Sequence, residues 1–229
     1  MSAAARLPIY EEILLLALDD DKGTTALDSL STFSIAMGGA MLAELAMAGA
    51  IKIDRKKKAE VKAVAGASVQ DPLLAECLQK IRDEKKTKKA AHWVQKFSGT
   101  KDLKNRAARQ MVTKGILKEG SDRVLGIFPR TIYPESDPGP EKELRDRLYW
   151  AIFTSAQEVD PGTVVVTALL HGAGLMNRVF DKKKLKSRKQ RLEKLTSGQV
   201  VGTAAKEAVE AAQAAVMVAT MVPIFVASS

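Results

Sequence analysis

Residues 41–61 read MLAELAMAGAIKIDRKKKAEV, and the pattern of this stretch changes at Gly49. Before the glycine, apolar residues recur at i and i+4, which predicts a helix from about residue 31 to residue 48. Glycine commonly ends a helix in the left-handed conformation, and the alternation at residues 51–53 predicts a strand directly after it. Residues 38–39 are both glycine, and each costs up to about 1 kcal/mol relative to alanine inside a helix. We therefore expect another segment to approach the helix backbone closely there.

The same succession of helix, glycine and strand recurs around Gly115, where ILK follows the glycine. The residues EGSD at 119–122 are a turn signal, and RVLGIF at 123–128 predicts a returning strand. Together they predict a β-hairpin whose tip displays Val124 and Leu125.

Two further apolar segments lie near the ends of the chain. Pro8 followed by IYEEILLLAL predicts a buried helix, because proline suits a first turn and the segment is apolar all round. Residues 208–227 are also apolar, but Glu210, Gln213 and Pro223 interrupt them, which favours a buried core helix over a membrane span. The sequence therefore predicts a mainly α-helical single domain with a surface β-hairpin.

Composition favours an anionic partner. The 229 residues are 46% hydrophobic, enough for a substantial core, and 36 Lys or Arg against 27 Asp or Glu give a formal net charge of +9. The excess gathers in residues 55–58, 85–89, 101–109 and 182–191. Phospholipid headgroups and nucleic acid both fit this charge, and a solvated loop or helix face is the alternative for each cluster.

No catalytic or metal-binding pattern accompanies the charge. His92 and His171 are far apart, each beside apolar residues, and we expect both to be packed or half-buried. The spacings H-E-x-x-H, G-x-S-x-G and G-x-x-x-x-G-K-[ST] are absent. The single Cys77 excludes an intramolecular disulfide and a cysteine-rich zinc site, and it favours a reducing compartment. With no secretory leader pattern, the sequence predicts a cytoplasmic, non-enzymatic protein without a cofactor.

The segment SGTKDLKNRAARQ offers the best candidate for a phosphate site. It predicts a helix whose N-cap is Thr100, with Lys101 and Lys104 on one face at the positive end of the helix dipole. Cations in that position cost about 0.3–1 kcal/mol unless an anion joins them. Free backbone N–H groups beside two lysines therefore predict a place for a phosphate group.

Four segments also resemble those of a known family, in the same order and at roughly the same spacing. They are LPIYEEILLLALDDDKGTT, GAMLAELAMAGAIKI, AARQMVTKGIL and LLHGAGLMNRVF, and they resemble the Golgi phosphoprotein 3 family, which includes bacterial members. The resemblance runs from Leu7 to about Phe225, and we expect a short tail at residues 1–6 and one domain at residues 7–226. It implies a central helical bundle wrapped by amphipathic helices, with an exposed β-hairpin.

The resemblance also implies a peripheral membrane protein that works as an adaptor. Eukaryotic members recognise phosphatidylinositol 4-phosphate and the cytoplasmic tails of glycosyltransferases. The partners implied here are anionic phospholipids and the cytoplasmic tails of membrane proteins. Val124 and Leu125 fall where the family places residues implicated in membrane insertion and self-association, so the resemblance implies membrane contact by the hairpin and the option of a homo-oligomer.

The phosphate pocket of the family maps onto changed residues in this chain. Carried over by position, its tryptophan falls on Ser29, its first arginine on Gly38, and its arginine pair on Lys101 and Lys104. Half of the pocket is thus missing, and lysine binds phosphate as a point charge rather than through a fork of donors. The resemblance therefore implies general affinity for anionic lipid rather than for one headgroup.

Three functional hypotheses stay open from the sequence. The first is the peripheral lipid-binding adaptor. The second, less favoured, is a winged-helix-like nucleic-acid-binding protein, with residues 104–115 as recognition helix and the hairpin as wing. The third is a scaffold that binds only protein. The hairpin has an alternative of its own, which is to pack against its own domain.

Overall fold

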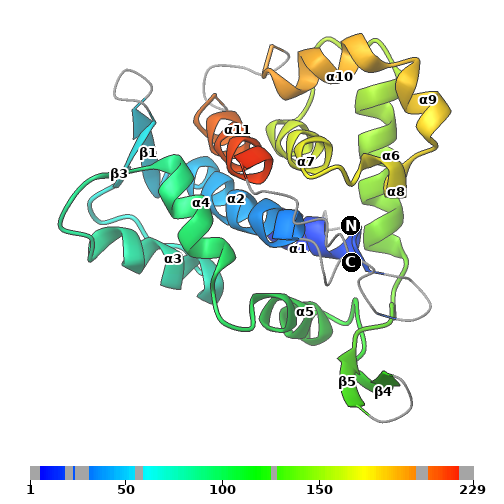
Figure 1. The fold of residues 1–229 in the computed structure, drawn as a ribbon, viewed down its shortest axis with the longest axis horizontal. Helices are drawn as coiled ribbons and strands as arrows, with labels where there is room; N and C mark the ends of the chain where they lie inside the picture. The colour runs from blue at the N-terminus through cyan, green and yellow to red at the C-terminus, as the bar shows by residue number, and fades with distance from the viewer. Residues whose placement is uncertain are drawn as a thin grey trace, which may run out of the picture.

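Figure 1 shows a mainly helical chain in which one long helix, α2, lies at the centre. This computed structural model describes residues 6–18, 23, 31–54, 59–124, 128–199 and 206–221. The helices in those ranges are α1 (Ile9–Leu15), α2 (Ser31–Met47), α3 (Pro72–Arg82), α4 (Ala90–Ser98), α5 (Leu103–Thr113), α6 (Gly139–Phe153), α7 (Pro161–Gly172), α8 (Met176–Val179), α9 (Lys182–Lys186), α10 (Lys189–Thr196) and α11 (Lys206–Met221). The strands are β1 (Ile51–Asp54), β2 (Glu60–Ala63), β3 (Lys88–Lys89), β4 (Gly120–Val124) and β5 (Phe128–Ile132). The predicted fold class, mainly α-helical with a β-hairpin, is confirmed.

Helix α2 is buried because it is apolar all round and helices α1, α4, α7 and α11 pack against it. Met41 and Leu45, one turn apart, are both fully buried. A Cβ atom added to Gly38 would lie 2.4 Å from the carbonyl oxygen of Val94 and 2.8 Å from the backbone nitrogen of Ser98, both in α4. The predicted close approach to the α2 backbone is therefore confirmed at Gly38, and the approaching segment is α4.

Both predicted helix-ending glycines adopt the left-handed conformation, with φ of 66° at Gly49 and 77° at Gly115. The residue after each glycine donates its N–H five residues back, Ala50 to the Leu45 carbonyl at 2.9 Å and Ile116 to the Met111 carbonyl at 3.0 Å. These bonds satisfy carbonyls that a helix end leaves free, so the same turn closes α2 and α5.

The hairpin exists, but its strands lie further along the chain than the sequence predicts. Residues 116–118 form no strand, although Leu117 makes an isolated bridge to Glu135. The predicted turn at 119–122 lies largely within β4, which pairs with β5 in antiparallel register, and Asp122 and Arg130 face each other in an ion pair of 2.8 Å. This cross-strand pairing overrides the local turn preference of EGSD.

A three-stranded antiparallel sheet in the order β1-β2-β3 was not predicted beyond its first strand. Ile53 of β1 pairs with Val61 of β2, and both side chains are buried. The strands β2 and β3 are too short, and too rich in Lys and Glu, to stand out in the sequence. The basic run at residues 55–58, between β1 and β2, lies outside the described residues.

The two terminal helices are buried as predicted. Every residue of α1 is buried, and Pro8 is its N-cap. In α11 the residues from Ala208 to Ala214 are buried apart from Glu210 and Gln213, which confirms a core helix over that part of the segment. No helix in the described ranges combines the length and the apolar character needed to cross a membrane.

Candidate functional site

The predicted phosphate site lies at the start of α5, but the helix begins later than the sequence predicts. Its first residue is Leu103 and its N-cap is Asp102, so the prediction of Thr100 as N-cap is wrong. Lys101 therefore lies in the turn before the helix and is exposed, whereas Lys104 lies in the first helical turn and is half-buried. The two lysines flank the helix start instead of sharing one helical face.

The conformation of Asp102 explains the later start. Its φ of 56° is left-handed, which a helical residue cannot adopt and which Asp tolerates better than most residues. Its carboxylate accepts hydrogen bonds from Asn105 at 2.5 Å and Arg109 at 3.3 Å, which hold it in place. It makes no capping hydrogen bond to the backbone N–H groups of the first turn. Of these groups, the N–H of Leu103 donates to the carbonyl of Thr100 at 3.3 Å, and the Asp102 side chain itself does not cover the start of the helix.

The arginines of α5 are paired within the domain. Arg106 binds Glu76 of α3 at 2.6 Å, and this hydrogen bond is the main cause of the lowered pKa of Glu76. Arg109 lies 3.6 Å from Glu119 as well as near Asp102. A recognition helix for nucleic acid needs cations available along its face, so these pairs speak against the winged-helix hypothesis. Within the described part of the chain, Lys101 makes no ion pair.

Of the other two predicted pocket positions, the structure describes Gly38 but not Ser29. Gly38 is buried against α4, in contact with Ser98, which precedes Lys101 by three residues. The structure thus brings Gly38 near the start of α5, but as a packing position between two helices. Ser29 lies outside the described residues.

The hairpin extends beyond the helices at the edge of the molecule next to α5 (Figure 1). Its residues Ser121, Asp122 and Arg123 are exposed. Val124 is the last residue of β4 and pairs with Phe128, and Leu125 lies outside the described residues.

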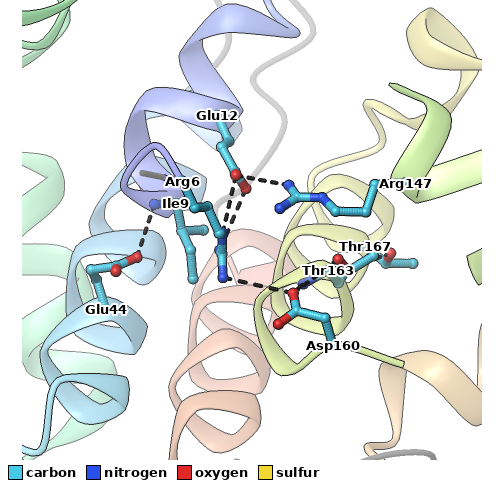
Figure 2. Close-up of polar contacts among 8 residues, drawn as sticks. All are labelled: Arg6, Ile9, Glu12, Glu44, Arg147, Asp160, Thr163 and Thr167. Carbon is cyan, nitrogen blue, oxygen red and sulfur yellow. Dashed lines mark hydrogen bonds and ion pairs between the residues drawn. The ribbon is translucent and has the colours of Figure 1, made fainter. Parts of the chain in front are cut away.

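Charged residues around α1 form a cluster that the sequence did not reveal (Figure 2). Arg6 lies 3.1 Å from Glu12 and 3.7 Å from Asp160, and Arg147 of α6 lies 2.7 Å from Glu12. Glu44 of α2 accepts the backbone N–H of Ile9 at 2.9 Å. Because these contacts join α1 to α2, α6 and the start of α7, the cluster holds the centre of the fold together.

Burial raises the pKa of two carboxyls in this region. Desolvation raises the pKa of Glu44 and raises that of Glu11 to about 7, although Lys114 at 2.5 Å acts in the opposite direction on Glu11. The hydroxyl of Tyr10 lies 2.6 Å from Asp71 and 2.5 Å from Gln110. These contacts tie α1 to α5 and to the start of α3.

The histidine prediction is wrong, because both His92 and His171 are exposed. His92 lies on the outer face of α4, with its ring against the edge of buried Trp93, and His171 lies in the last turn of α7. Cys77 is buried, which raises the pKa of its thiol to about 12. Among the described residues, no group of three or more His, Cys, Asp or Glu is arranged to hold a metal ion.

The fold and the site define a helical domain built around one buried helix, with a projecting hairpin beside α5. The chain matches the family model described as Golgi phosphoprotein 3 (GPP34) over residues 9–212, and it belongs to that family. The match confirms the resemblance seen in the four sequence segments.

Proposed function

We propose that this protein is a peripheral membrane adaptor that binds anionic phospholipid headgroups at the start of α5 and contacts the membrane with its hairpin. Family membership across residues 9–212 carries the proposal, since the family is known for phosphoinositide-binding adaptors of the Golgi. Clients would be the cytoplasmic tails of membrane proteins.

The local geometry supports a role for Lys101 and Lys104. Lys101 is exposed and unpaired among the described residues, and Asp102 leaves the first-turn N–H groups of α5 uncapped by its side chain. Lysine donors lack the fork that selects one headgroup, so we propose affinity for negative surface charge in general.

Vesicle cosedimentation tests this function. A lysine near an anionic leaflet contributes about 1 kcal/mol, so Lys101→Glu with Lys104→Glu, which also adds repulsion, should weaken binding to phosphatidylserine vesicles at least roughly 30-fold. Binding should fall as salt increases. Vesicles with phosphatidylserine and vesicles with phosphatidylinositol 4-phosphate should bind the protein about equally well when their surface charge is the same.

A matched control is Lys52→Glu with Lys62→Glu. These exposed lysines lie opposite each other in β1 and β2, so the change in net charge is the same but its site is distant from α5. If both double variants lose vesicle binding equally, the loss reflects net charge and not the α5 site. If the Lys101/Lys104 variant binds vesicles as well as the parent does, the proposed site is refuted. Absence of vesicle binding by the parent protein at low salt would refute the proposed function itself.

A further inference from the structure

The segment from Asp181 to Lys194, which contains α9 and most of α10, holds most of the excess positive charge of the chain. It has eight Lys or Arg and two carboxylates, a net +6 out of the +9 of the whole protein. Leu185 and Leu192 are buried and fix the two short helices to the domain. The lysines therefore lie on the outer side, and the exposed ones are Lys182, Lys183, Lys184, Lys186, Lys189 and Lys194.

The two arginines at the start of α10 and within it bind backbone carbonyls of the domain. Arg188 donates to the carbonyl of Phe153 at 2.8 Å. Arg191 donates to the carbonyls of Ala151 at 2.9 Å and Ala156 at 2.7 Å. These bonds satisfy carbonyls at the C-terminal end of α6 and just after it, and they hold α10 against α6.

The exposed lysines of this segment, by contrast, are available to bind an anion. The carboxylate of Asp181 accepts the backbone N–H groups of Lys183 and Lys184, at 2.9 and 3.0 Å, and so caps α9. In the described part of the chain, no carboxylate lies within ion-pair distance of any of the six exposed lysines.

Two adjacent aromatic side chains on α6 are exposed, and the first of them lies beside this basic segment. Tyr149 and Trp150 are 51% and 50% exposed, which is unusual for side chains of their size. The Tyr149 ring stacks on Phe153 with centroids 4.8 Å apart and lies 6.4 Å from Phe180, the residue directly before Asp181. Tyr149 thus lies next to the residue that precedes the basic segment, Trp150 follows it on the exposed side of α6, and exposed Asp146 lies one turn before both.

A hollow of about 770 Å³ lies between residues 154–157, after α6, and residues 186–191 with Lys194. Its lining contains five Lys or Arg together with hydroxyl and amide side chains, and it contains no carboxylate of the described residues. The hollow is large enough for a phosphate-bearing headgroup, and its lining favours a negative charge.

We infer that α9, α10 and the aromatic pair of α6 form a second membrane-binding surface, which takes anionic phospholipid headgroups. Lysines supply attraction to the leaflet, and Tyr and Trp are the residues that settle at the boundary between headgroups and acyl chains. Figure 1 places α9 and α10 at an edge of the molecule away from α5 and the hairpin, so the surface is separate from the site proposed above.

The distribution of donors favours a membrane over nucleic acid. Arginine forks read phosphates and bases best, but Arg188 and Arg191 are bound to backbone carbonyls. The remaining donors are lysines, which interact as point charges, beside aromatic rings that gain from leaving water.

Tryptophan fluorescence gives a direct test, because the chain has two tryptophans and Trp93 is only 1% exposed. Phosphatidylcholine vesicles with phosphatidylserine should shift the emission of Trp150 to the blue and protect it from acrylamide. Trp150→Phe should abolish the shift while leaving most of the binding. Lys182→Glu with Lys186→Glu should weaken binding at least roughly 30-fold, because each lost lysine contributes a factor of about five and each glutamate adds repulsion. The pair Lys52→Glu and Lys62→Glu is again the matched control, and circular dichroism with thermal melting confirms that every variant is folded.

The outcomes separate this surface from the α5 site. An unchanged Trp150 emission at saturating vesicle concentration, or parental affinity of the Lys182/Lys186 variant, overturns the second surface, even where the α5 variant loses binding. Loss in the Lys182/Lys186 variant with a Trp150 shift in the parent supports it, even where the α5 variant binds normally. Binding of duplex DNA that depends on the same lysines, without vesicle binding, would assign the surface to nucleic acid and overturn the inference.

Discussion

Replacing Gly38 by alanine should destabilise the protein, although alanine is the better helix former. The added Cβ would lie 2.4 Å from the Val94 carbonyl oxygen and 2.8 Å from the Ser98 nitrogen. Both neighbours are backbone atoms, which cannot rotate away, so α4 must move outward from α2. Overpacking of this kind costs about 1–3 kcal/mol, and the gain in helix propensity returns at most about 1 kcal/mol.

We therefore expect Gly38→Ala to lower the free energy of unfolding by about 2 kcal/mol, taking the upper end of that range because the neighbours are rigid. For a chain of this length, this corresponds to a fall in Tm of about 4–8 °C. Urea unfolding can be followed through Trp93, which is buried in α4 beside Val94. Trp150→Phe serves as the background, since it leaves Trp93 as the only indole.

The control is Ser34→Ala, at a half-buried position of the same helix, where we expect little change in stability. A Gly38→Ala protein that is as stable as its parent, or about 1 kcal/mol more stable as propensity alone would give, contradicts the close contact between α2 and α4.

Two further predictions concern the charges around α1. Burial raises the pKa of Glu11 from 4.5 to about 7, so the folded state holds this proton more tightly than the unfolded state does. The stabilisation is full below about pH 4.5 and is lost as the pH rises through about 7, so the urea midpoint should fall across that window, and Glu11→Gln should flatten the fall. Gly162→Ala places a Cβ 1.7 Å from the Arg6 guanidinium and should expel it from Asp160, with a loss of about 1–2 kcal/mol in unfolding free energy. Arg6→Ala should lower the unfolding free energy by a similar amount, and the variant that combines both changes should lose no more than either single variant. Fully additive losses would show that Gly162→Ala does not act through Arg6.

Much of the fold was predictable because helix ends and buried helices are encoded locally. The glycines that close α2 and α5, the buried helix after Pro8 and the C-terminal core helix follow from patterns a few residues long. The order of four such segments was also enough to indicate the family that the chain belongs to.

The candidate sites depended more on tertiary structure. Sequence reasoning named Lys101 and Lys104, but it placed the helix start too early, because the left-handed Asp102 is held by Arg109, seven residues away. It also treated residues 182–191 as one of several basic clusters. The exposed Tyr149 comes next to that segment only through its contact with Phe180 and through the packing of α10 against α6.

The sequence by itself determined where helices end, which segments are apolar and how much positive charge the protein carries, since each of these is a property of near neighbours or of composition. Only the tertiary structure decided which charges stay available. Arg106 is neutralised by Glu76, thirty residues away, whereas the lysines of α9 meet no carboxylate in the described part of the chain. Ion pairing and close packing depend on distances between segments far apart in sequence, and a local pattern does not contain those distances.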